Sequence, residues 1–276
     1  MSQDEHFQFV QSLARELNRK EITLTSFPDV VLRVRKALNE PDTSAGQIAE
    51  ILGVDPALAS RVLVLSNSSF HNPRGVKIES LNAAVGRIGL NEIRTIAIAY
   101  AVEQLHASEN LDALKDELRN AWSVALRLAA MSHVIAAQCT KLDSDSAFIA
   151  GLLNQIGVLY IFSKHGEYPN LLQDPEARQS LIDEWTAPIG ESIVTNWEFS
   201  DDIRESVNPD QDEDARRGTK VNLADVVIAA KTMLDEKEVE VTSTPEGRRL
   251  ALSEEQLPLL SEAYQQKLDS LVSSVR

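Results

Sequence analysis

Histidine, cysteine and carboxylate side chains are the groups in this 276-residue chain that could bind a metal ion or act as a nucleophile. The histidines are His6, His71, His106, His133 and His165. None lies four residues from another, so no helix could present two of them as a zinc pair. Cys139 falls in an expected helix with no neighbour that would lower its pKa. Asp143 and Asp145 precede another expected helix, where they would cap its N-terminus. These residues predict neither a metal site nor a nucleophile.

Residues 44–65 resemble a DNA-reading helix-turn-helix motif, since two short helical patterns flank Gly53. A reading helix normally presents several Arg, Lys, Asn or Gln side chains to bases and phosphates. The second helix here offers Arg61 and then mostly Leu and Val, which indicates burial. DNA binding through residues 44–65 therefore stays a minor alternative. The chain also has no G-x-x-x-x-G-K, G-x-G-x-x-G or G-x-S-x-G motif, so the common phosphate loops and the nucleophile elbow are excluded.

The composition indicates an acidic protein with enough apolar residues, 43%, to bury a large core. Ala and Leu dominate and Gly and Pro are sparse, which favours helix over sheet. The net charge of −15 falls mainly on residues 106–276, which carry 16 Lys or Arg and 30 Asp or Glu. Such a surface would repel nucleic-acid phosphates and anionic lipid. The polar N-terminus, the single cysteine and the lack of an apolar run near the ~20 residues that span a bilayer predict a cytoplasmic protein outside the membrane.

Apolar spacing and capping residues predict helices along the whole chain and no sheet. Ser44 with Gln47, Asp55 and Ser80 are N-terminal caps of three of these helices. An acidic, irregular stretch is expected over residues 208–218. The expected helices cover residues 9–17, 30–38, 45–52, 56–66, 81–88, 93–102, 111–139, 145–164, 175–198, 220–234 and 253–273. The predicted fold class is all-α.

A series of short motifs carries a resemblance to a known family. The motifs are Phe27-Pro28-x-Val30-Val31, Ile48-Ala49, Asp55-Pro56-Ala57-Leu58, Leu65-Ser66-Asn67-Ser68, Ile78 to Leu81, Ala84 and Ile88-Gly89-Leu90. One of them would be weak evidence, but this ordered series resembles the HDOD family, signalling modules related to HD-type metal-dependent phosphohydrolases. The resemblance runs from about Thr23 to about Asn208.

The second half resembles the HD frame with its metal ligands replaced. Trp122 stands where HD enzymes carry their first histidine, and Asn154-Gln155 replace the His-Asp pair within the segment from Gly151 to Gly157. Thr186 and Asn208 fall near further histidine positions of the family. An indole offers no lone pair to a cation, and amide oxygens bind metals weakly without carboxylate partners. The resemblance thus implies a degenerate site with no metal, no cofactor and no activated water, in which Trp122 fills the vacated space.

The resemblance also implies an architecture and a function. An N-terminal helical subdomain over residues 1–105 is expected to pack on an HD-like helical bundle over 106–208, and an acidic loop with C-terminal helices over 209–276 completes the bundle. The implied function is that of a non-enzymatic bacterial signalling or adaptor protein. Its partners in trans would be a kinase, a response regulator or a cyclic-di-GMP enzyme. A residual metal-dependent phosphohydrolase that uses other ligands is the alternative from a different class.

The loop over residues 66–77 is the candidate contact surface for such a partner. Asn67, Ser68, Arg74 and Lys77 supply polar and cationic groups there, next to an apolar helix. Asn67 has a second interpretation, which we prefer: its side chain turns the backbone where the helix ends, because Asn readily hydrogen-bonds nearby backbone groups.

Overall fold

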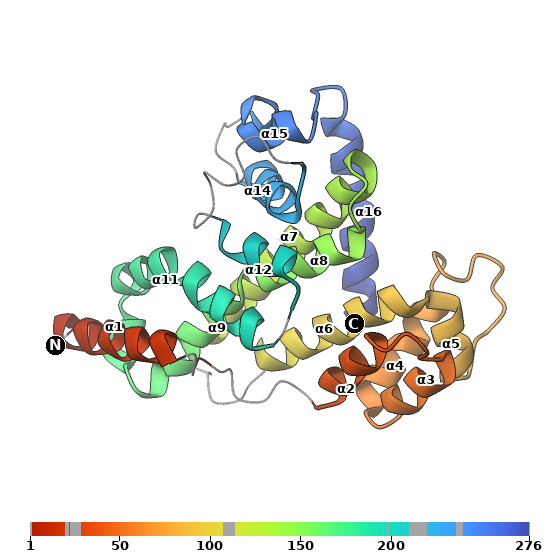
Figure 1. The fold of residues 1–276 in the computed structure, drawn as a ribbon, viewed down its shortest axis with the longest axis horizontal. Helices are drawn as coiled ribbons and strands as arrows, with labels where there is room; N and C mark the ends of the chain where they lie inside the picture. Colours follow the sequence, from red (N-terminus) through yellow and green to blue (C-terminus); the bar gives the residue numbers. More distant parts are fainter. Residues whose placement is uncertain are drawn as a thin grey trace. The chain divides into compact units, whose positions relative to one another are not determined.

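Helices are the regular elements of the computed structural model over the residues that it describes, which are 2–19, 22, 29–106, 114–197, 199–209, 220–235 and 240–275 (Figure 1). The all-α prediction is confirmed over these ranges. The chain divides into two compact units. We call Met1–Thr25 with His106–Tyr264 the bundle unit, and Ser26–Leu105 with Gln265–Arg276 the small unit.

The two units differ from the expected domains at both ends of the chain. One boundary between the two units falls after residue 105. Residues 1–25, however, group with the bundle unit, and residues 265–276 group with the small unit. Local sequence could not reveal either assignment, because both segments join their units through residues far away in the chain. The expected Phe27-Pro28 opening and most of the expected acidic stretch, residues 210–218, lie outside the described residues.

The small unit consists of short capped helices around an aliphatic core. It contains α2 (Asp29–Leu38), α3 (Ala45–Leu52), α4 (Pro56–Ser66), α5 (Leu81–Ile88), α6 (Leu90–His106) and the end of α16 (Leu257–Val275). As predicted, Ser44 and Gln47 form a capping box on α3, and Asp55 and Ser80 cap α4 and α5. Fully buried side chains make the core, among them Val31, Ile48, Leu52, Leu58, Val62 and Ile93.

Helix α4 is joined to α6 by side chains that a DNA-reading helix would need to leave free. The Tyr100 hydroxyl donates to Asp55 Oδ2 at 2.9 Å. Arg61 pairs with Glu103, and its guanidinium lies 5.2 Å from the centre of the Tyr100 ring. The arginine expected to face a phosphate or a base is thus engaged within the protein. This arrangement gives no support to DNA binding through residues 44–65.

The bundle unit is organised around α7 (Lys115–Cys139) and α8 (Ser144–Leu153), which pack along each other (Figure 1). A Cβ atom at Gly151 would lie 2.8 Å from the backbone of Ala129, so this close approach requires glycine. Helix α14 (Leu223–Leu234) packs on α7, and α12 (Asp201–Val207) packs on α8 and α14. The remaining elements are α1 (Ser2–Arg19), α9 (Ile156–Ser163), η2 (Lys164–Gly166), α10 (Pro169–Gln173), α11 (Pro175–Asn196), η4 (Val241–Ser243) and α15 (Pro245–Arg249).

The expected continuous helix over residues 145–164 is wrong. Asn154 ends α8 as its C-cap, and α9 begins after Gln155. The segment Ser144–Gly166 is apolar and long enough to cross a membrane by length and composition, so the expectation that no apolar run approaches this length is wrong. Within it, 83% of the most apolar window is buried inside the protein. We therefore interpret this segment as the core of the bundle unit.

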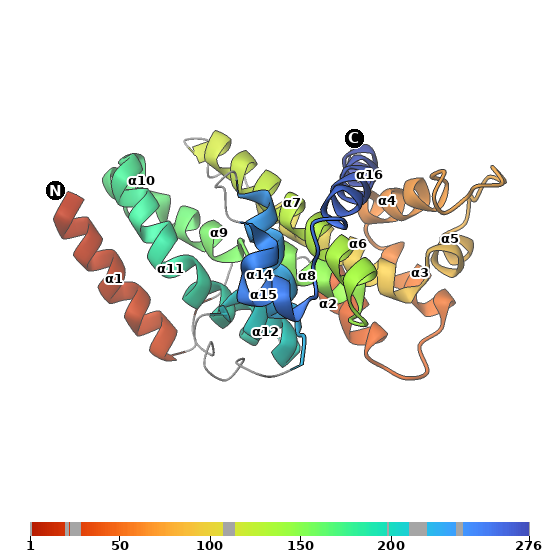
Figure 2. The ribbon, with the colours of Figure 1, turned by 90° about the horizontal axis from the view of Figure 1, so that it is seen from above.

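Helix α1 belongs to the bundle unit because its side chains contact the segment around α10 (Figure 2). The Glu5 carboxylate accepts hydrogen bonds from Asn170 Nδ2 at 2.6 Å and from the Leu171 backbone N–H at 2.8 Å. It thereby satisfies a free N–H group in the first turn of α10. Phe9 is buried and meets the Tyr168 ring edge-on, with ring centres 5.4 Å apart.

A second contact of α1 is the cluster of Glu16, Tyr160 and Lys164. The buried Tyr160 hydroxyl donates to Glu16 Oε2, and Lys164 Nζ lies 3.3 Å from Glu16 Oε1. Burial raises the pKa of Tyr160, so the phenol keeps its proton and remains a donor. Burial alone would raise the pKa of Glu16, but its bond to Tyr160 and the charge of Lys164 outweigh burial and lower that pKa below 4.5.

Replacing Tyr160 with phenylalanine is expected to lower the free energy of unfolding by about 2 kcal/mol, because a buried charge-assisted hydrogen bond is lost. Since the folded pKa of Glu16 is lowered, its contribution is present above pH 4.5 and is lost as the pH falls through the folded pKa. Urea unfolding at pH 7 and pH 4 would measure both effects. Tyr168→Phe is the matched control, because it keeps the ring contact with Phe9. An equal loss in the two variants would contradict the assignment.

Candidate functional site

Three of the five expected metal-site positions come together at one cavity in the bundle unit. Asn154, Gln155 and Thr186 line a cavity of about 480 Å³ between the α8–α9 joint, α11, the end of α12, α14 and α15. Its apolar lining comes from Ile182, Ala187, Val207, Pro209 and Ile228, and its charged lining from Asp183, Lys231 and Glu246. The positions of Trp122 and Asn208 are outside this lining.

The expectation that the Trp122 indole fills the vacated space is not met. Trp122 is half-buried on α7 and does not line the cavity, which stays open. The replaced ligand position on α7 is therefore not part of the wall beside Asn154.

Asn154 and Gln155 form the joint between α8 and α9. The Asn154 side chain is 2% exposed. Its Nδ2 lies 3.4 Å from the Ser206 carbonyl oxygen, and its Oδ1 lies 3.5 Å from Gln155 Nε2. Both distances exceed the usual 2.7–3.2 Å range of N–H···O bonds. A buried carboxamide at the cavity wall is thus only weakly satisfied by these contacts.

Thr186 reaches the cavity because α9 and α11 touch at their backbones. A Cβ atom at Gly157 would lie 2.1 Å from the Thr186 carbonyl oxygen, so α11 approaches α9 as closely as a glycine allows. The Thr186 hydroxyl is buried and has no hydrogen-bond partner among the described residues. Asn154 and Thr186 therefore leave two incompletely satisfied polar groups at one cavity.

Asn208 is held in a separate polar network on α11 and α12. Its Nδ2 donates to Glu191 Oε2 at 2.8 Å, and Arg204 Nη1 donates to Glu191 Oε1 at 2.8 Å. The hydrogen bond to Glu191 raises the pKa of Arg204, so this cation is permanent. The Asn208 side chain thus links the end of α12 to α11, and its Nδ2 group is already hydrogen-bonded to the Glu191 carboxylate.

A charged network that was not predicted from the sequence lies behind the cavity. Asp225 on α14 is 1% exposed and accepts hydrogen bonds from Arg249 Nε at 3.0 Å and Nη2 at 2.6 Å. Arg249 Nη2 also donates to Glu246, which lines the cavity, at 2.9 Å. The bond to Asp225 raises the pKa of Arg249. The local signal for part of this network was the Asn222–Asp225 spacing, which forms a capping box at the start of α14.

The side chains at the expected metal positions do not fit a divalent cation. Asn154 and Gln155 supply neutral amide oxygens, Thr186 supplies a hydroxyl, and the Trp122 indole supplies no lone pair. No group of three or more His, Cys, Asp or Glu is placed to hold a metal in the part of the chain that the structure describes. Burial raises the pKa of the Cys139 thiol, which disfavours the nucleophilic thiolate.

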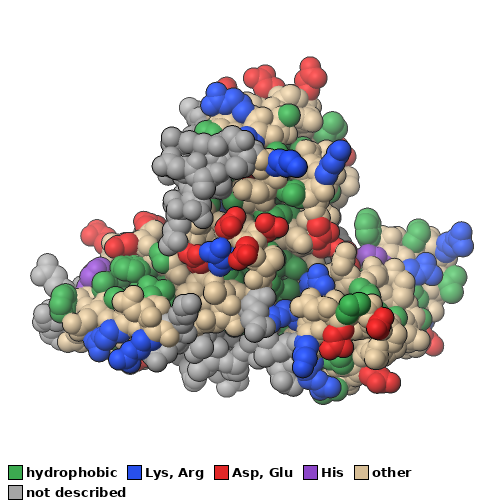
Figure 3. Space-filling view, in the orientation of Figure 1, with side chains coloured by type: hydrophobic (Ala, Val, Ile, Leu, Met, Phe, Trp, Pro, Cys, Tyr) green, Lys and Arg blue, Asp and Glu red, His purple; other side chains and the backbone are tan. Residues whose placement is uncertain are grey.

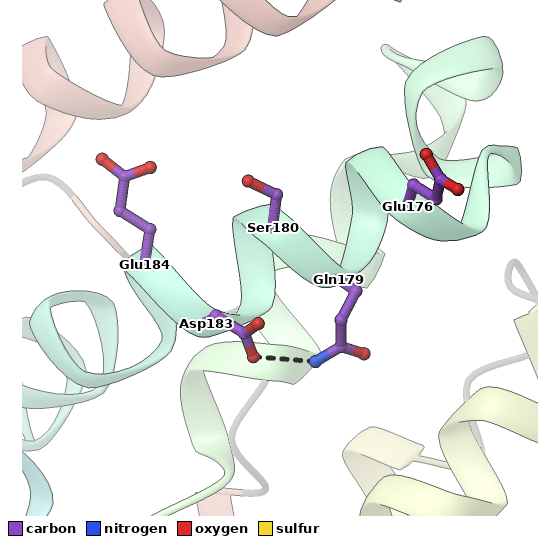
Figure 4. A pocket seen from close by; sticks show the side chains of 5 residues that line it. All are labelled: Glu176, Gln179, Ser180, Asp183 and Glu184. Atoms are coloured by element: carbon purple, nitrogen blue, oxygen red, sulfur yellow. Dashed lines mark hydrogen bonds between the residues drawn. The ribbon is translucent and has the colours of Figure 1, made fainter.

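A second hollow, of about 660 Å³, lies on the exposed face of α11. Figure 4 shows Glu176, Ser180 and Glu184 pointing to one side of the helix and Gln179 and Asp183 to the other. Gln179 Nε2 donates to Asp183 Oδ1 at 2.8 Å. These solvated side chains come from one helix, so they form a polar helix surface and not an enclosed site.

The candidate contact loop, residues 66–77, is held in shape by two asparagines. Asn67 Nδ2 donates to the carbonyl oxygens of Leu63 at 2.9 Å and Ile78 at 2.8 Å, while its Oδ1 accepts from the Ile78 N–H at 2.8 Å. The side chain therefore fastens both ends of the loop together, and the turning role preferred for Asn67 is confirmed. Asn72 is buried and donates to the Val76 carbonyl oxygen at 2.7 Å.

The tip of this loop presents apolar and cationic side chains to solvent. Phe70 is 78% and Val76 is 66% exposed, and Arg74 and Lys77 are exposed beside them. In Figure 3, hydrophobic and Lys or Arg side chains lie together over the loop between α4 and α5. Lys77 also pairs with the exposed Glu79 at 2.7 Å. Ser68 is half-buried and lies 3.5 Å from the His71 N–H, so its side chain faces the loop itself.

Replacing Asn67 with alanine is expected to destabilise the small unit by about 2–3 kcal/mol, since three hydrogen bonds of a partly buried side chain are lost. The Ile78 amide should exchange with deuterium faster, because its acceptor is the Asn67 side chain. Hydrogen-exchange mass spectrometry would measure this. Asn82→Ala, on the exposed face of α5, is the control and should leave Ile78 unchanged. Unaltered exchange at Ile78 in the Asn67 variant would disprove the bracing role.

The sequence of this chain matches a protein-family model and a curated relative. The HDOD domain family model matches residues 24–212. A curated relative, described as an uncharacterized protein of Treponema pallidum (strain Nichols), is 24% identical over 191 residues, which are 65% of this chain and 36% of the relative. The chain thus spans about a third of the length of that curated relative.

Solved structures share the helical fold. A candidate metal-dependent phosphohydrolase from Shewanella amazonensis SB2B matches with a TM-score of 0.76 at 27% identity, over 99% of this chain and 100% of that chain. An HDOD domain protein with unknown function from Geobacter sulfurreducens matches with a TM-score of 0.67 at 22% identity, over 95% of each chain. A candidate signal transduction protein from Marinobacter aquaeolei VT8 matches with a TM-score of 0.64 at 18% identity, over 98% of this chain and 65% of that chain. At these lower identities the likeness concerns the fold alone.

Proposed function

Because the chain belongs to the HDOD family, we propose that it is a non-enzymatic adaptor of a bacterial signalling pathway that binds its partner through the loop over residues 66–77. The partner acts in trans and is a kinase, a response regulator or a cyclic-di-GMP enzyme in the cytoplasm. The observation that carries the proposal is the braced loop with an exposed phenylalanine at its tip. The signal transduction protein among the structural neighbours is consistent with such a role.

The shape of the loop favours binding to another protein. Aromatic side chains dominate the binding energy of protein interfaces when they enter a pocket on the partner. Phe70 is 78% exposed, and leaving such a side chain in water has no benefit for the isolated fold. The hydrogen bonds of Asn67 and Asn72 fix the loop beforehand, so binding would cost little ordering entropy.

The charge of this region favours an acidic partner. Residues 56–91 carry four Lys or Arg and one Glu, in a chain whose net charge is −15. Arg74 and Lys77 stand next to Phe70 and Val76 at the loop tip. An apolar pocket rimmed by Asp or Glu would complement this surface and speed association.

The proposal is tested by quantitative cross-linking and recovery of partners from bacterial lysate with the full chain. Phe70→Ser with Val76→Ser, and Arg74→Glu with Lys77→Glu, should each reduce recovery of the specific partner about tenfold or more. Leu259→Ser and Arg119→Glu are controls, because both residues are exposed on the bundle unit. Equal recovery with all four variants would refute binding through the loop.

The non-enzymatic part of the proposal rests on the side chains at the expected metal positions, which are poor ligands for a divalent cation. The alternative, a metal-dependent phosphohydrolase, has a separate test. One structural neighbour carries the description of a candidate metal-dependent phosphohydrolase. Metal analysis of the purified chain and phosphodiesterase turnover with Mn²⁺ address this point. Stoichiometric metal with a rate that chelation abolishes would overturn the non-enzymatic proposal.

A further inference from the structure

The cavity beside Asn154 offers polar groups that lack good partners, which is the condition for a ligand site. Buried polar groups in proteins are almost always hydrogen-bonded, and exceptions call for an explanation such as a ligand or an ordered water. The Asn154 carboxamide is 2% exposed and has contacts of only 3.4 and 3.5 Å. The Thr186 hydroxyl is buried without a partner among the described residues. Both groups line the same space of about 480 Å³.

The remaining lining restricts the ligand. Ile182, Val207 and Ile228 give apolar walls, which suit a flat hydrophobic face. Asp183 and Glu246 contribute two carboxylates against one ammonium from Lys231, and the Arg249 guanidinium that pairs with Glu246 is itself neutralised by the buried Asp225. Phosphate groups are therefore disfavoured by like charge. The volume lies in the range of small-ligand pockets.

The carboxamides define the hydrogen-bonding edge that the ligand must present. An amide side chain offers a donor and an acceptor side by side, the pairing by which Asn and Gln bind heterocyclic bases through two hydrogen bonds. Asn154 and Gln155 place two such groups together at the joint of α8 and α9. A cyclic amide has the matching donor and acceptor on one edge, and the Thr186 hydroxyl could bind a further acceptor.

We propose that this cavity binds an uncharged oxo-heterocycle, a nucleobase or its unphosphorylated nucleoside, and excludes the corresponding nucleotide. The site is independent of the loop over residues 66–77. The cavity thus gives the protein a small-molecule binding site in addition to the proposed partner-binding loop.

The test is isothermal titration of the full chain with inosine and uridine, and with their 5′-monophosphates as comparators. Saturable binding of at least one nucleoside is expected, with its monophosphate at least about tenfold weaker, a change that corresponds to about 1.4 kcal/mol. Thr186→Val should weaken binding roughly two- to tenfold by removing one hydrogen bond. Thr195→Val is the matched control on the same helix, because its exposed hydroxyl donates to the Glu191 carbonyl oxygen.

The outcomes are distinct. Circular dichroism and a melting curve first establish that both threonine variants are folded. No binding of either nucleoside at millimolar concentration means that ordered water satisfies Asn154 and Thr186, and it overturns the proposal. Equal binding of nucleoside and monophosphate overturns the charge argument, and equal loss in both threonine variants overturns the assignment to this cavity. None of these results depends on partner recovery through the loop.

Discussion

Replacement of Arg249 by methionine is expected to lower the free energy of unfolding of the bundle unit by about 3–5 kcal/mol. The reason is the carboxylate left behind, since Asp225 is 1% exposed and Arg249 supplies the cation that compensates it. Methionine fills a similar volume but offers no charge and no donor. Among the described residues, the backbone N–H of Asn222 would then be the one remaining donor to the buried Asp225 carboxylate.

Chemical denaturation followed by circular dichroism measures this effect. Arg248→Met is the matched control, because the neighbouring side chain is exposed and its replacement should change stability by less than about 0.5 kcal/mol. Asp225→Asn in the Arg249→Met background should restore part of the loss, since a neutral amide costs less to bury than a carboxylate. Similar stability of the two arginine variants would show that the buried pair is not a major contributor.

Replacement of Gly157 by alanine is the second large effect that the structure predicts. The added Cβ atom would lie 2.1 Å from the Thr186 carbonyl oxygen, which is backbone and cannot rotate away. Helices α9 and α11 would have to separate, at a cost of about 3 kcal/mol. Because Thr186 lines the cavity, the same shift should also disturb the proposed ligand site.

The melting temperature of the variant gives the stability loss. Gly166→Ala is a suitable control in the same unit, because nothing lies within 4 Å of its added Cβ atom. That substitution should leave stability nearly unchanged. A Gly157→Ala variant with the melting temperature of the native chain would contradict the close contact between α9 and α11.

Local structure was largely predictable from the sequence because its causes are local. The caps at Ser44, Asp55 and Ser80 form with residues two or three positions away, and all three were predicted. The turning role of Asn67 was also readable, although its partner Ile78 lies eleven residues later. The all-α class followed from composition and periodicity.

The break at Asn154-Gln155 and the cavity beside it depend on contacts between distant segments. The apolar run on either side of the pair masked the break, although two carboxamides within such a run were a usable signal. The space itself requires α11, α12, α14 and α15, and two of these, α12 and α15, were not predicted. The pairing of Asp225 with Arg249 joins residues 24 positions apart on separate helices, and no local pattern encodes it.

The docking of α1 on the segment around α10 has a consequence for synthesis of the chain on the ribosome. Glu5 must wait for Asn170 to emerge before the contact can form, and Glu16 must wait for Tyr160. The small unit likewise receives residues 265–276 only after the whole bundle unit has been synthesised. Neither unit is a continuous stretch of chain, so a nascent chain of 105 residues holds neither in complete form. Until then the apolar face of α1, with Phe9 and Leu13, has no surface to pack on, which favours aggregation of the nascent chain.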